Sequence, residues 1–397
     1  MFNKSQLKNP RLVHLITDEK FPDSAYELFE AVLPGQNEFI LPGKKKTIKN
    51  LKKIKPIRVG KYDYLKPSFV DFINEYDALL VHGMNSFSIR VINRCRSGLK
   101  VFWIGMGFDY YDLIFKSKEA MLKPHTKAVA RDLTVLKERN SGYVLKSGKK
   151  AIKKLLRWDS LDKKKQLLNR VDYFCPVLES EFYSVLGVMN GWGPKYVDWN
   201  YGNSADLVDG EFGEKFELGD NILLGNSAAQ TNNHLDSMYL LKKYESFFSY
   251  KAKIIAPLSY GDMVYGAKVC EKGAELFGDR FIPLTDMLSS DSYRRILESC
   301  GYVVMNHIRQ QAGNNIAQAL FMGARVFLDK NNPFYEEYKS KGAAINSLSD
   351  IETSPELLGS PLSDEEKAVN KVLLKQVRGR DVAISKTRNL INEIVEA

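Results

Sequence analysis

The stretch from Ser299 to Tyr338 constrains the fold more than any other part of the chain. It opens with an apolar run, Tyr302–Met305, whose length and β-branched content predict a buried strand. A polar loop follows, and apolar residues then recur every three or four positions up to Gly323, which predicts a helix that ends there. A second apolar run, Arg325–Leu328, predicts another strand. Strand, loop, helix and strand in this order indicate a parallel α/β unit.

The polar loop of this unit is the first candidate for a ligand site. In a parallel sheet it would lie at the carboxyl end of a strand and at the start of a helix, where free N–H groups favour anions. The loop holds one cation, several amides and a glycine, in Arg309, Gln310, Gln311, Gly313 and Asn314. A Gly-Asn pair alone would indicate only a turn, but the added cation and amides favour a nucleotide diphosphate.

The rest of the chain repeats this pattern. Apolar runs that end in polar or glycine-bearing loops predict strands at residues 11–17, 38–41, 76–82, 99–104, 173–177, 221–224, 253–257 and 281–283. The stretch 200–220 is rich in glycine and acidic residues and predicts a linker. We therefore expect two doubly wound α/β domains, residues 1–205 and 206–358, and a charged helical segment, 359–397, that packs back across both.

Composition narrows the class of protein. No run of 18 apolar residues is present, and the N-terminus lacks the apolar core of a signal peptide, so we expect a mature cytoplasmic chain. The four cysteines are far apart and form no cluster with histidine, which disfavours a metal site. Walker and G-x-G-x-x-G motifs are absent, which disfavours ATPases and dehydrogenases, and we expect no cofactor.

The net charge of +10 indicates an anionic partner, and the charge is concentrated in two runs, 44–55 and 146–170. The second run predicts a basic amphipathic helix suited to an anionic membrane surface, with the residues Lys149, Lys150, Lys153, Lys154, Arg157 and Trp158. A solvated basic face is an equally good interpretation. Nucleic acid is disfavoured, because no binding module accompanies these lysines.

The residues of the predicted loops favour an enzyme that transfers a sugar over a hydrolase. Gly225, Asn226 and Ser227 form a second anion-binding loop in the second domain, and no nucleophile triad or carboxylate cluster stands out. Displacement at a sugar carbon needs one base and fixed positive charge for the departing diphosphate. Asp109, which follows a predicted strand and a glycine turn, is the first choice of base, and Asp18 and His82 are its rivals.

The residues also resemble a known family, the bacterial TDP-N-acetylfucosamine:lipid II N-acetylfucosaminyltransferases. The resemblance is strongest from Ile222 to Phe334 and rests there on Gly225-Asn226-Ser227, Asn233-His234, Pro257, Tyr260, Arg309-Gln310-Gln311, Gly323 and Asn332-Pro333-Phe334. In the first half it rests on His14, His82-Gly83, Phe102-Trp103, Gly107, Asp109 and Tyr111. Two loops depart from the family pattern, at Met106–Asp109 and Ala312–Asn315, and both fall in expected substrate loops.

The resemblance implies a GT-B fold with two Rossmann-like domains and an inverting, metal-independent transfer at the cytoplasmic face of the bacterial inner membrane. The donor would be TDP-linked 4-acetamido-4,6-dideoxygalactose and the acceptor an undecaprenyl-diphosphate-linked saccharide of enterobacterial common antigen or a related surface polysaccharide. The resemblance adds His234, Pro257, Tyr260, Asn332, Pro333 and Phe334 to the donor residues, and His14, Gly83, Trp103, Gly107 and Tyr111 to the acceptor side. The alternatives are a nucleotide-sugar epimerase of the same architecture and a non-catalytic scaffold that binds nucleotide sugar or lipid.

Overall fold

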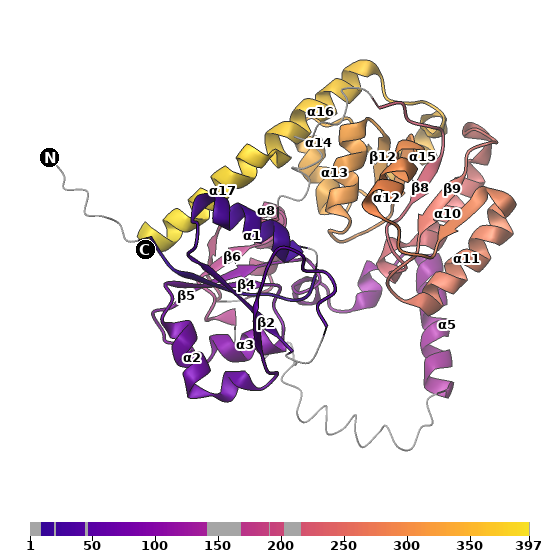
Figure 1. Ribbon diagram of the computed structural model, residues 1–397. Coiled ribbons are helices and arrows are strands. Elements are labelled where there is room, and N and C mark those ends of the chain that lie inside the picture. Colours follow the sequence, from indigo (N-terminus) through magenta and orange to yellow (C-terminus); the bar gives the residue numbers. More distant parts are fainter. Residues whose placement is uncertain are drawn as a thin grey trace. The chain divides into compact units, whose positions relative to one another are not determined.

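The computed structural model describes residues 9–19, 21–43, 47–140, 168–189, 191–201 and 216–396, which form two compact units (Figure 1). Unit 1 contains the described residues up to Lys116, those of 168–201 and those from Arg378 onward. Unit 2 contains residues 117–140 and 216–377. Each unit is built on its own parallel sheet.

The sheet of unit 1 has seven strands in the order β3-β2-β1-β4-β5-β6-β7, all parallel. The strands are β1 (Leu12–Leu15), β2 (Asn37–Pro42), β3 (Ile57–Val59), β4 (Ala78–His82), β5 (Lys100–Ile104), β6 (Tyr173–Cys175) and β7 (Lys195–Tyr196). The helices are α1 (Phe21–Val32), α2 (Pro67–Asn74), α3 (Ser86–Ile92), α4 (Tyr111–Ile114), α8 (Glu179–Leu186) and α17 (Arg380–Glu396). Chain order reverses between the neighbours β1 and β4, so their loops diverge there and leave room for a ligand.

The sheet of unit 2 has six strands in the order β10-β9-β8-β11-β12-β13, again all parallel. The strands are β8 (Ile222–Leu224), β9 (Ile254–Pro257), β10 (Phe281–Leu284), β11 (Tyr302–Met305), β12 (Arg325–Leu328) and β13 (Asn346–Ser347). The helices are α5 (Pro124–Asn140), α10 (His234–Lys243), α11 (Met263–Phe277), α12 (Ser290–Glu298), α13 (Gly313–Met322), α14 (Pro333–Ser340), α15 (Leu348–Thr353) and α16 (Asp364–Arg378). Here the order reverses between β8 and β11.

The central strands are apolar because both of their faces are covered by helices. All five residues of β4 and all four residues of β11 are buried. A strand buried on both faces shows a continuous apolar run instead of alternation, which is the pattern from which the sequence predicted these strands. The C-terminal helix α17 contributes to the core of unit 1 through Leu390 and Ile394 and packs against α1, and the two helices lie side by side in Figure 1.

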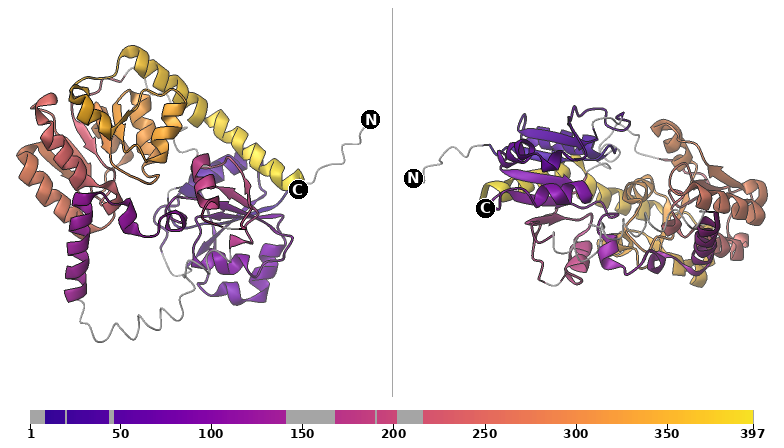
Figure 2. Two further views of the ribbon diagram at one scale, coloured as in Figure 1. Left: turned by 180° about the vertical axis from the view of Figure 1, so that it is seen from behind. Right: turned by 90° about the horizontal axis from the view of Figure 1, so that it is seen from below.

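Helix α5 lies in unit 2, although the sequence-based boundary at 205/206 assigns its residues to the first domain. Its first turn is fixed by Asp236 of α10, whose carboxylate oxygens accept hydrogen bonds from the backbone nitrogens of His125 and Thr126 at 2.9 and 3.0 Å. Figure 2 shows α5, in purple, beside the α10–α11 layer from a second direction. A helix can belong to a different unit from the residues that precede it when its packing contacts are with that other unit. A local sequence pattern does not show which unit a helix packs against. Within the described residues no helix is both long and apolar enough to cross a membrane.

One buried carboxyl group ties α8 to the loop after β5. Glu181 is 1% exposed and accepts hydrogen bonds from the hydroxyls of Tyr110 and Tyr111 at 2.7 and 2.6 Å, and from the backbone nitrogen of Leu178 at 3.0 Å. Burial raises the pKa of Glu181 to about 7, and the three hydrogen bonds only partly oppose this shift. The carboxyl group therefore takes up a proton in the folded state at a pH where the unfolded chain has lost it.

We predict that Glu181→Gln flattens the pH dependence of stability. Between a pH of roughly 4.5 and 7 the folded state binds more protons than the unfolded state at this site, so the wild type loses stability as pH rises through that window. Glutamine does not titrate, so the variant does not lose stability in this way. Its stability relative to wild type should improve by up to about 3 kcal/mol from pH 4.5 to pH 8. Urea unfolding at several pH values measures this difference, and a constant offset between the two proteins would contradict it.

Candidate functional site

Three loops of unit 2 meet at the carboxyl edge of its sheet. Gln311, from the loop after β11, donates from Nε2 to Oδ1 of Asn226 at 2.9 Å, and Asn226 follows β8. The amide of Asn226 in turn donates to the hydroxyl of Tyr260, which follows β9, at 3.1 Å. The sequence-predicted residues Asn226, Tyr260 and Gln311 are thus brought together across the point where strand order reverses.

Asn232, which is not among the residues predicted from the sequence, links the loops of this edge. The side chain is 1% exposed, and its Oδ1 accepts from the backbone nitrogen of Asn226 at 2.9 Å and lies 2.7 Å from Nε2 of His307. Its Nδ2 donates to the carbonyl oxygen and hydroxyl of Ser227 at 3.0 and 3.2 Å. The one signal in the sequence is the polar run Thr231-Asn232-Asn233-His234 before a helix, which also fits an ordinary helix start.

The backbone of the Gly225 loop needs a residue without a side chain. Gly225 has a φ of +68°, and an added Cβ would lie 2.6 Å from Nε2 of His234 and 2.8 Å from Oδ1 of Asn232. Both the left-handed conformation and the close approach therefore exclude larger residues. Ala312, directly before α13, also has a left-handed backbone, with a φ of +58°. A non-glycine residue in this region is uncommon and indicates that the loop is held by its surroundings.

Two buried histidines lie beneath these loops as neutral rings. Burial lowers the pKa of His234 to about 3 and lowers that of His307 well below its ordinary value, with the charge of Arg309 adding to the second effect. Nδ1 of His234 lies 3.3 Å from the hydroxyl oxygen of Tyr265. These rings are polar supports for the loop and are not positive charges at neutral pH.

Positive charge at this edge comes from the start of α13 and from Arg309. Arg309, Gly313 and Asn314 are half-buried, and an added Cβ on Gly313 would lie 2.5 Å from the ring of Phe334. Asn332 accepts from the backbone nitrogen of Phe334 at 2.9 Å and caps α14, and Pro333 is the first residue of that helix. Asn332, Pro333 and Phe334 therefore support the loop from behind, while Arg309 and Asn314 remain half-exposed. Gln310 is buried next to Arg309 in the chain, and Pro257 is buried at the end of β9.

In unit 1, Asp109 organises the loops after β4 and β5. Its side chain is 3% exposed, and Oδ2 accepts from the backbone nitrogen of Met84 and the indole nitrogen of Trp103, both at 2.7 Å. Oδ1 accepts from the backbone nitrogen of Met106 at 2.8 Å. This geometry favours a positioning role over the role of general base that the sequence suggested, because a base needs access to the substrate proton.

His82 belongs to a buried chain of three polar side chains. Its Nε2 lies 3.0 Å from Nδ1 of His14, and its Nδ1 lies 2.7 Å from the hydroxyl of Tyr201. Burial lowers the pKa of His14 to about 3 and that of His82 well below its ordinary value. Burial also raises the pKa of Tyr201, and the charges of Asp109 and Glu19 raise it further. His14, Trp103 and Tyr111 are buried in this core and Gly83 and Gly107 form its turns, so these predicted acceptor residues shape the edge from below.

Asp18 lines a cavity of about 660 Å³ at the carboxyl ends of β1, β2 and β4. Its two carboxylate oxygens accept from the backbone nitrogens of Lys49 and Asn50 at 2.8 and 2.9 Å. The pKa of Asp18 is lowered: these backbone hydrogen bonds and the charge of Arg58 outweigh the opposing effect of desolvation, which is the largest single contribution. A carboxylate stabilised in this way is a weak base.

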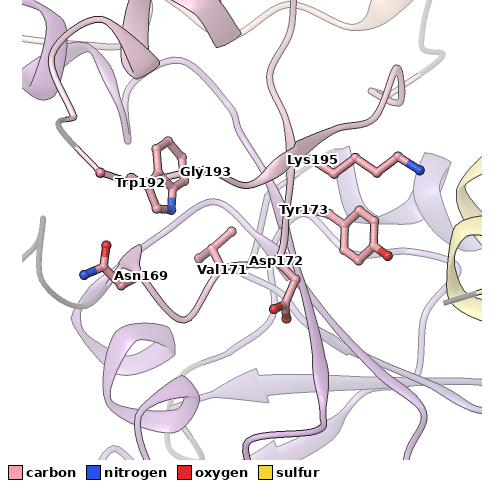
Figure 3. A pocket seen from close by; sticks show the side chains of 8 residues that line it. Asn169, Val171, Asp172, Tyr173, Trp192, Gly193 and Lys195 are labelled. Carbon is pink, nitrogen blue, oxygen red and sulfur yellow. The ribbon is translucent and has the colours of Figure 1, made fainter.

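A second cavity, of about 350 Å³, lies at the other edge of the same sheet (Figure 3). Its lining includes Asp172 and Tyr173 at the start of β6 and Lys195 at the start of β7, together with Trp192. The amino ends of these strands face away from the loops described above, and no sequence-predicted site residue lines this cavity. Among the described residues no group of three or more His, Cys, Asp or Glu side chains could hold a metal ion. The predicted membrane residues Lys149, Lys150, Lys153, Lys154, Arg157 and Trp158 lie outside the described residues.

We predict that Asn232→Ala destabilises unit 2 by about 3 kcal/mol. The change leaves the backbone nitrogen of Asn226 and the carbonyl of Ser227 without a partner in a buried site. Asn331→Ala, an exposed asparagine in the loop after β12, is the matched control and should cost less than about 1 kcal/mol. Urea unfolding measures the free energy of unfolding of both variants. An equal decrease in the two variants would show that the hydrogen bonds of Asn232 do not stabilise unit 2.

We predict that Asp109→Asn lowers stability by about 2 kcal/mol, because an amide NH₂ group would face N–H donors in the buried site. Activity per folded molecule should stay within roughly tenfold of wild type, since the group acts through the loop. If the activity of correctly folded Asp109→Asn falls by more than about a hundredfold, Asp109 is the general base after all.

The chain is similar to known glycosyltransferases in part of its sequence and in its fold. Residues 213–352 match the family model described as 4-alpha-L-fucosyltransferase, glycosyl transferase group 56. No curated protein matches the chain. Similar solved structures include a Rickettsia africae glycosyltransferase (12% identity, 98% of this chain and 100% of that chain covered, TM-score 0.61). Two others are Anabaena HepE with UDP and glucose (11%, 98% and 100%, 0.60) and the lipopolysaccharide outer core galactosyltransferase WaaB (10%, 96% and 99%, 0.59).

The matched residues begin before β8 and end within α15, so they contain all of the loops that meet at the carboxyl edge of unit 2. The structural similarities extend over nearly the whole chain and confirm the expected α/β GT-B fold. The resemblance from which the family was first suggested is strongest over the same part of the sequence as the family match. The chain is thus a glycosyltransferase with the GT-B fold, and its residues 213–352 match the model of the group 56 fucosyltransferase family.

Proposed function

We propose that the protein transfers a deoxy-amino sugar from a nucleotide diphosphate to a saccharide linked to polyprenyl diphosphate. The acceptor hydroxyl displaces the diphosphate directly, so the configuration at the anomeric carbon inverts. The observation that carries this proposal is the edge of unit 2, where the hydrogen-bonded pair Asn226–Gln311 lies beside the start of α13. That arrangement supplies amide groups for a sugar and positive potential for a diphosphate.

The donor diphosphate would lie against Arg309 and the free N–H groups at the start of α13. As the bond to the anomeric carbon breaks, negative charge develops on the departing diphosphate, and a fixed guanidinium and helix terminus stabilise it without reorganisation. The positive charge that the reaction needs would thus come from the protein itself. Gly225 allows the left-handed turn after β8 from which Asn226 reaches this edge.

A nucleotide sugar as donor is supported by the similar fold of Anabaena HepE, which was solved with UDP and glucose. TDP and a 4-acetamido-4,6-dideoxygalactose-like sugar are our choice because the residues resemble the N-acetylfucosaminyltransferases and match a fucosyltransferase model. The loop departs from that resemblance at Ala312 to Asn315. We propose that these residues determine which sugar the enzyme accepts on the donor.

We further propose a lipid-linked acceptor and a peripheral location at the cytoplasmic face of the bacterial inner membrane, in the synthesis of a surface polysaccharide such as enterobacterial common antigen. A chain with a net charge of +10 is attracted to an anionic membrane. The basic residues on which this location depends are those of 149–158, and they can be tested by binding to anionic vesicles at low and high salt.

We predict that Arg309→Ala lowers kcat/KM for sugar transfer by a factor of about 10² to 10³, because the departing diphosphate loses its positive partner. Arg309→Lys should recover part of the loss, since it keeps the charge but not the two-pronged geometry. Arg295→Ala, at an exposed site on α12, is the matched control.

The assay measures release of nucleoside diphosphate from TDP- and UDP-sugars in the presence of a polyprenyl-diphosphate-linked saccharide. Release that depends on the acceptor supports transfer, and turnover of the sugar nucleotide without any acceptor would support an epimerase instead. Equal activity of Arg309→Ala and Arg295→Ala would remove Arg309 from the donor site. A thermal-shift screen across nucleotide sugars identifies the donor, because a ligand that binds the folded state raises its melting temperature.

A further inference from the structure

The cavity in unit 1 lies where a doubly wound sheet binds its ligand. Its walls come from the residues after β1, the end of β2 and the start of α3 after β4. Strand order reverses between β1 and β4, so the loops after these two strands turn to opposite faces of the sheet. At about 660 Å³ the space is large enough for a sugar and part of its substituents.

The lining of this cavity combines the groups that a charged saccharide requires. One wall is the half-buried ring of Phe87, which is held in place by the rings of Tyr64 and Phe69 at centroid distances of 6.0 and 6.2 Å. An aromatic ring fixed in this way offers a flat apolar face to the C–H side of a sugar ring. The guanidinium of Arg58 and the amide of Asn85 line the same space and can bind phosphate or hydroxyl oxygens.

Two carboxylates line the cavity, and they differ in what they can do. Asp18 is fixed by backbone N–H groups of the loop at 49–51, and its pKa is lowered. Glu19, the next residue, is half-buried and lines the same space. Its charge also contributes to the raised pKa of the buried Tyr201.

The other candidate bases of unit 1 do not reach this cavity. Asp109 is 3% exposed with both oxygens bonded, and His82 is 1% exposed with both ring nitrogens within hydrogen-bonding distance of a neighbour. Neither residue lines the cavity. A general base has to come within about 3 Å of the proton that it removes, so exposure to the substrate space decides between these groups.

We propose that this cavity binds the saccharide of the acceptor and that Glu19 is the general base of the transfer. The inference rests on the proposed function. The Glu19 carboxylate accepts the proton of the acceptor hydroxyl as its oxygen forms a bond to the anomeric carbon of the donor. The bond from that carbon to the diphosphate oxygen breaks at the same time, and its electron pair leaves with the nucleoside diphosphate. Asp18 holds the neighbouring loop, and Phe87 positions the sugar ring.

The binding arm of the test needs no turnover. The probe is a saccharide on a short, soluble prenyl diphosphate, and its affinity for the full chain is measured by calorimetry without donor. Phe87→Ala should weaken binding about tenfold or more, while Phe72→Ala, a half-buried phenylalanine of α2 outside the cavity, should leave it unchanged. Absence of binding to wild type, or equal binding by Phe87→Ala and wild type, would overturn the assignment of the cavity.

The chemical arm uses transfer activity with the same probe. Glu19→Gln should lower kcat by a factor of about 10² to 10⁴ with unchanged probe affinity, and Glu19→Asp should retain part of the rate because it keeps a carboxylate. Glu38→Gln, a half-buried carboxyl group on β2 outside the cavity, is the matched control. A Glu19→Gln enzyme with near wild-type kcat would exclude Glu19 as the base.

The two arms separate this inference from the proposed function. If wild type binds the probe in the cavity but transfers no sugar from any nucleotide donor, the proposed function fails and the acceptor site stands. If transfer occurs and Phe87→Ala and Glu19→Gln both behave as wild type, the proposed function stands and this inference fails.

Discussion

Parallel strand pairing is the constraint on which the rest of this structure depends. All the strand pairs of both sheets are parallel, so every strand delivers its following loop to the same edge of its sheet. The reversal of strand order between β1 and β4, and again between β8 and β11, then separates two neighbouring loops at one point of each edge. The cavity of unit 1 and the Asn226–Gln311 contact of unit 2 both lie at these points.

The two edges use polar groups in different ways. In unit 2, uncharged amides link the loops after β8, β9 and β11, and the histidines beneath them are kept neutral by burial. The positive potential at this edge comes from Arg309 and the start of α13, which are only half-buried and can bind an anion. In unit 1, buried carboxyl groups organise the loops, with Asp109 below the β4 and β5 loops and Glu181 behind them. A low-dielectric interior makes such hydrogen bonds strong and makes an unpaired group costly, which is why these networks fix the loop geometry.

Several of the residues that the sequence marks as site candidates are buried polar groups in the structure. His82 ends β4 and Asp109 lies in the loop after β5. At such places the sequence pattern of a catalytic residue is the same as that of a residue that supports a loop. Burial and hydrogen-bond partners distinguish the two, and both come from residues far away in sequence, such as Tyr201 for His82. Asn232 was missed for the same reason, since its partners Asn226, Ser227 and His307 assemble only when the loops meet. Glu19 showed no motif of its own. It lines the same cavity as Asp18, whose carboxylate is held by the backbone nitrogens of Lys49 and Asn50.

The sequence by itself determined the central strands and the class of fold, because a strand buried on both faces must be a continuous apolar run and a helix must show its own period. It did not predict the short edge strands β3, β7 and β13. Strands β11 and β12 have the boundaries that local pattern predicts. The residue types of the polar loop from Arg309 to Asn314 were also enough to mark it as an anion-binding candidate. Only the tertiary structure decided that α5 belongs to unit 2, which side chains at the sheet edges are buried supports, and which line open space. These properties depend on contacts between distant residues, and a local pattern along the chain does not contain them.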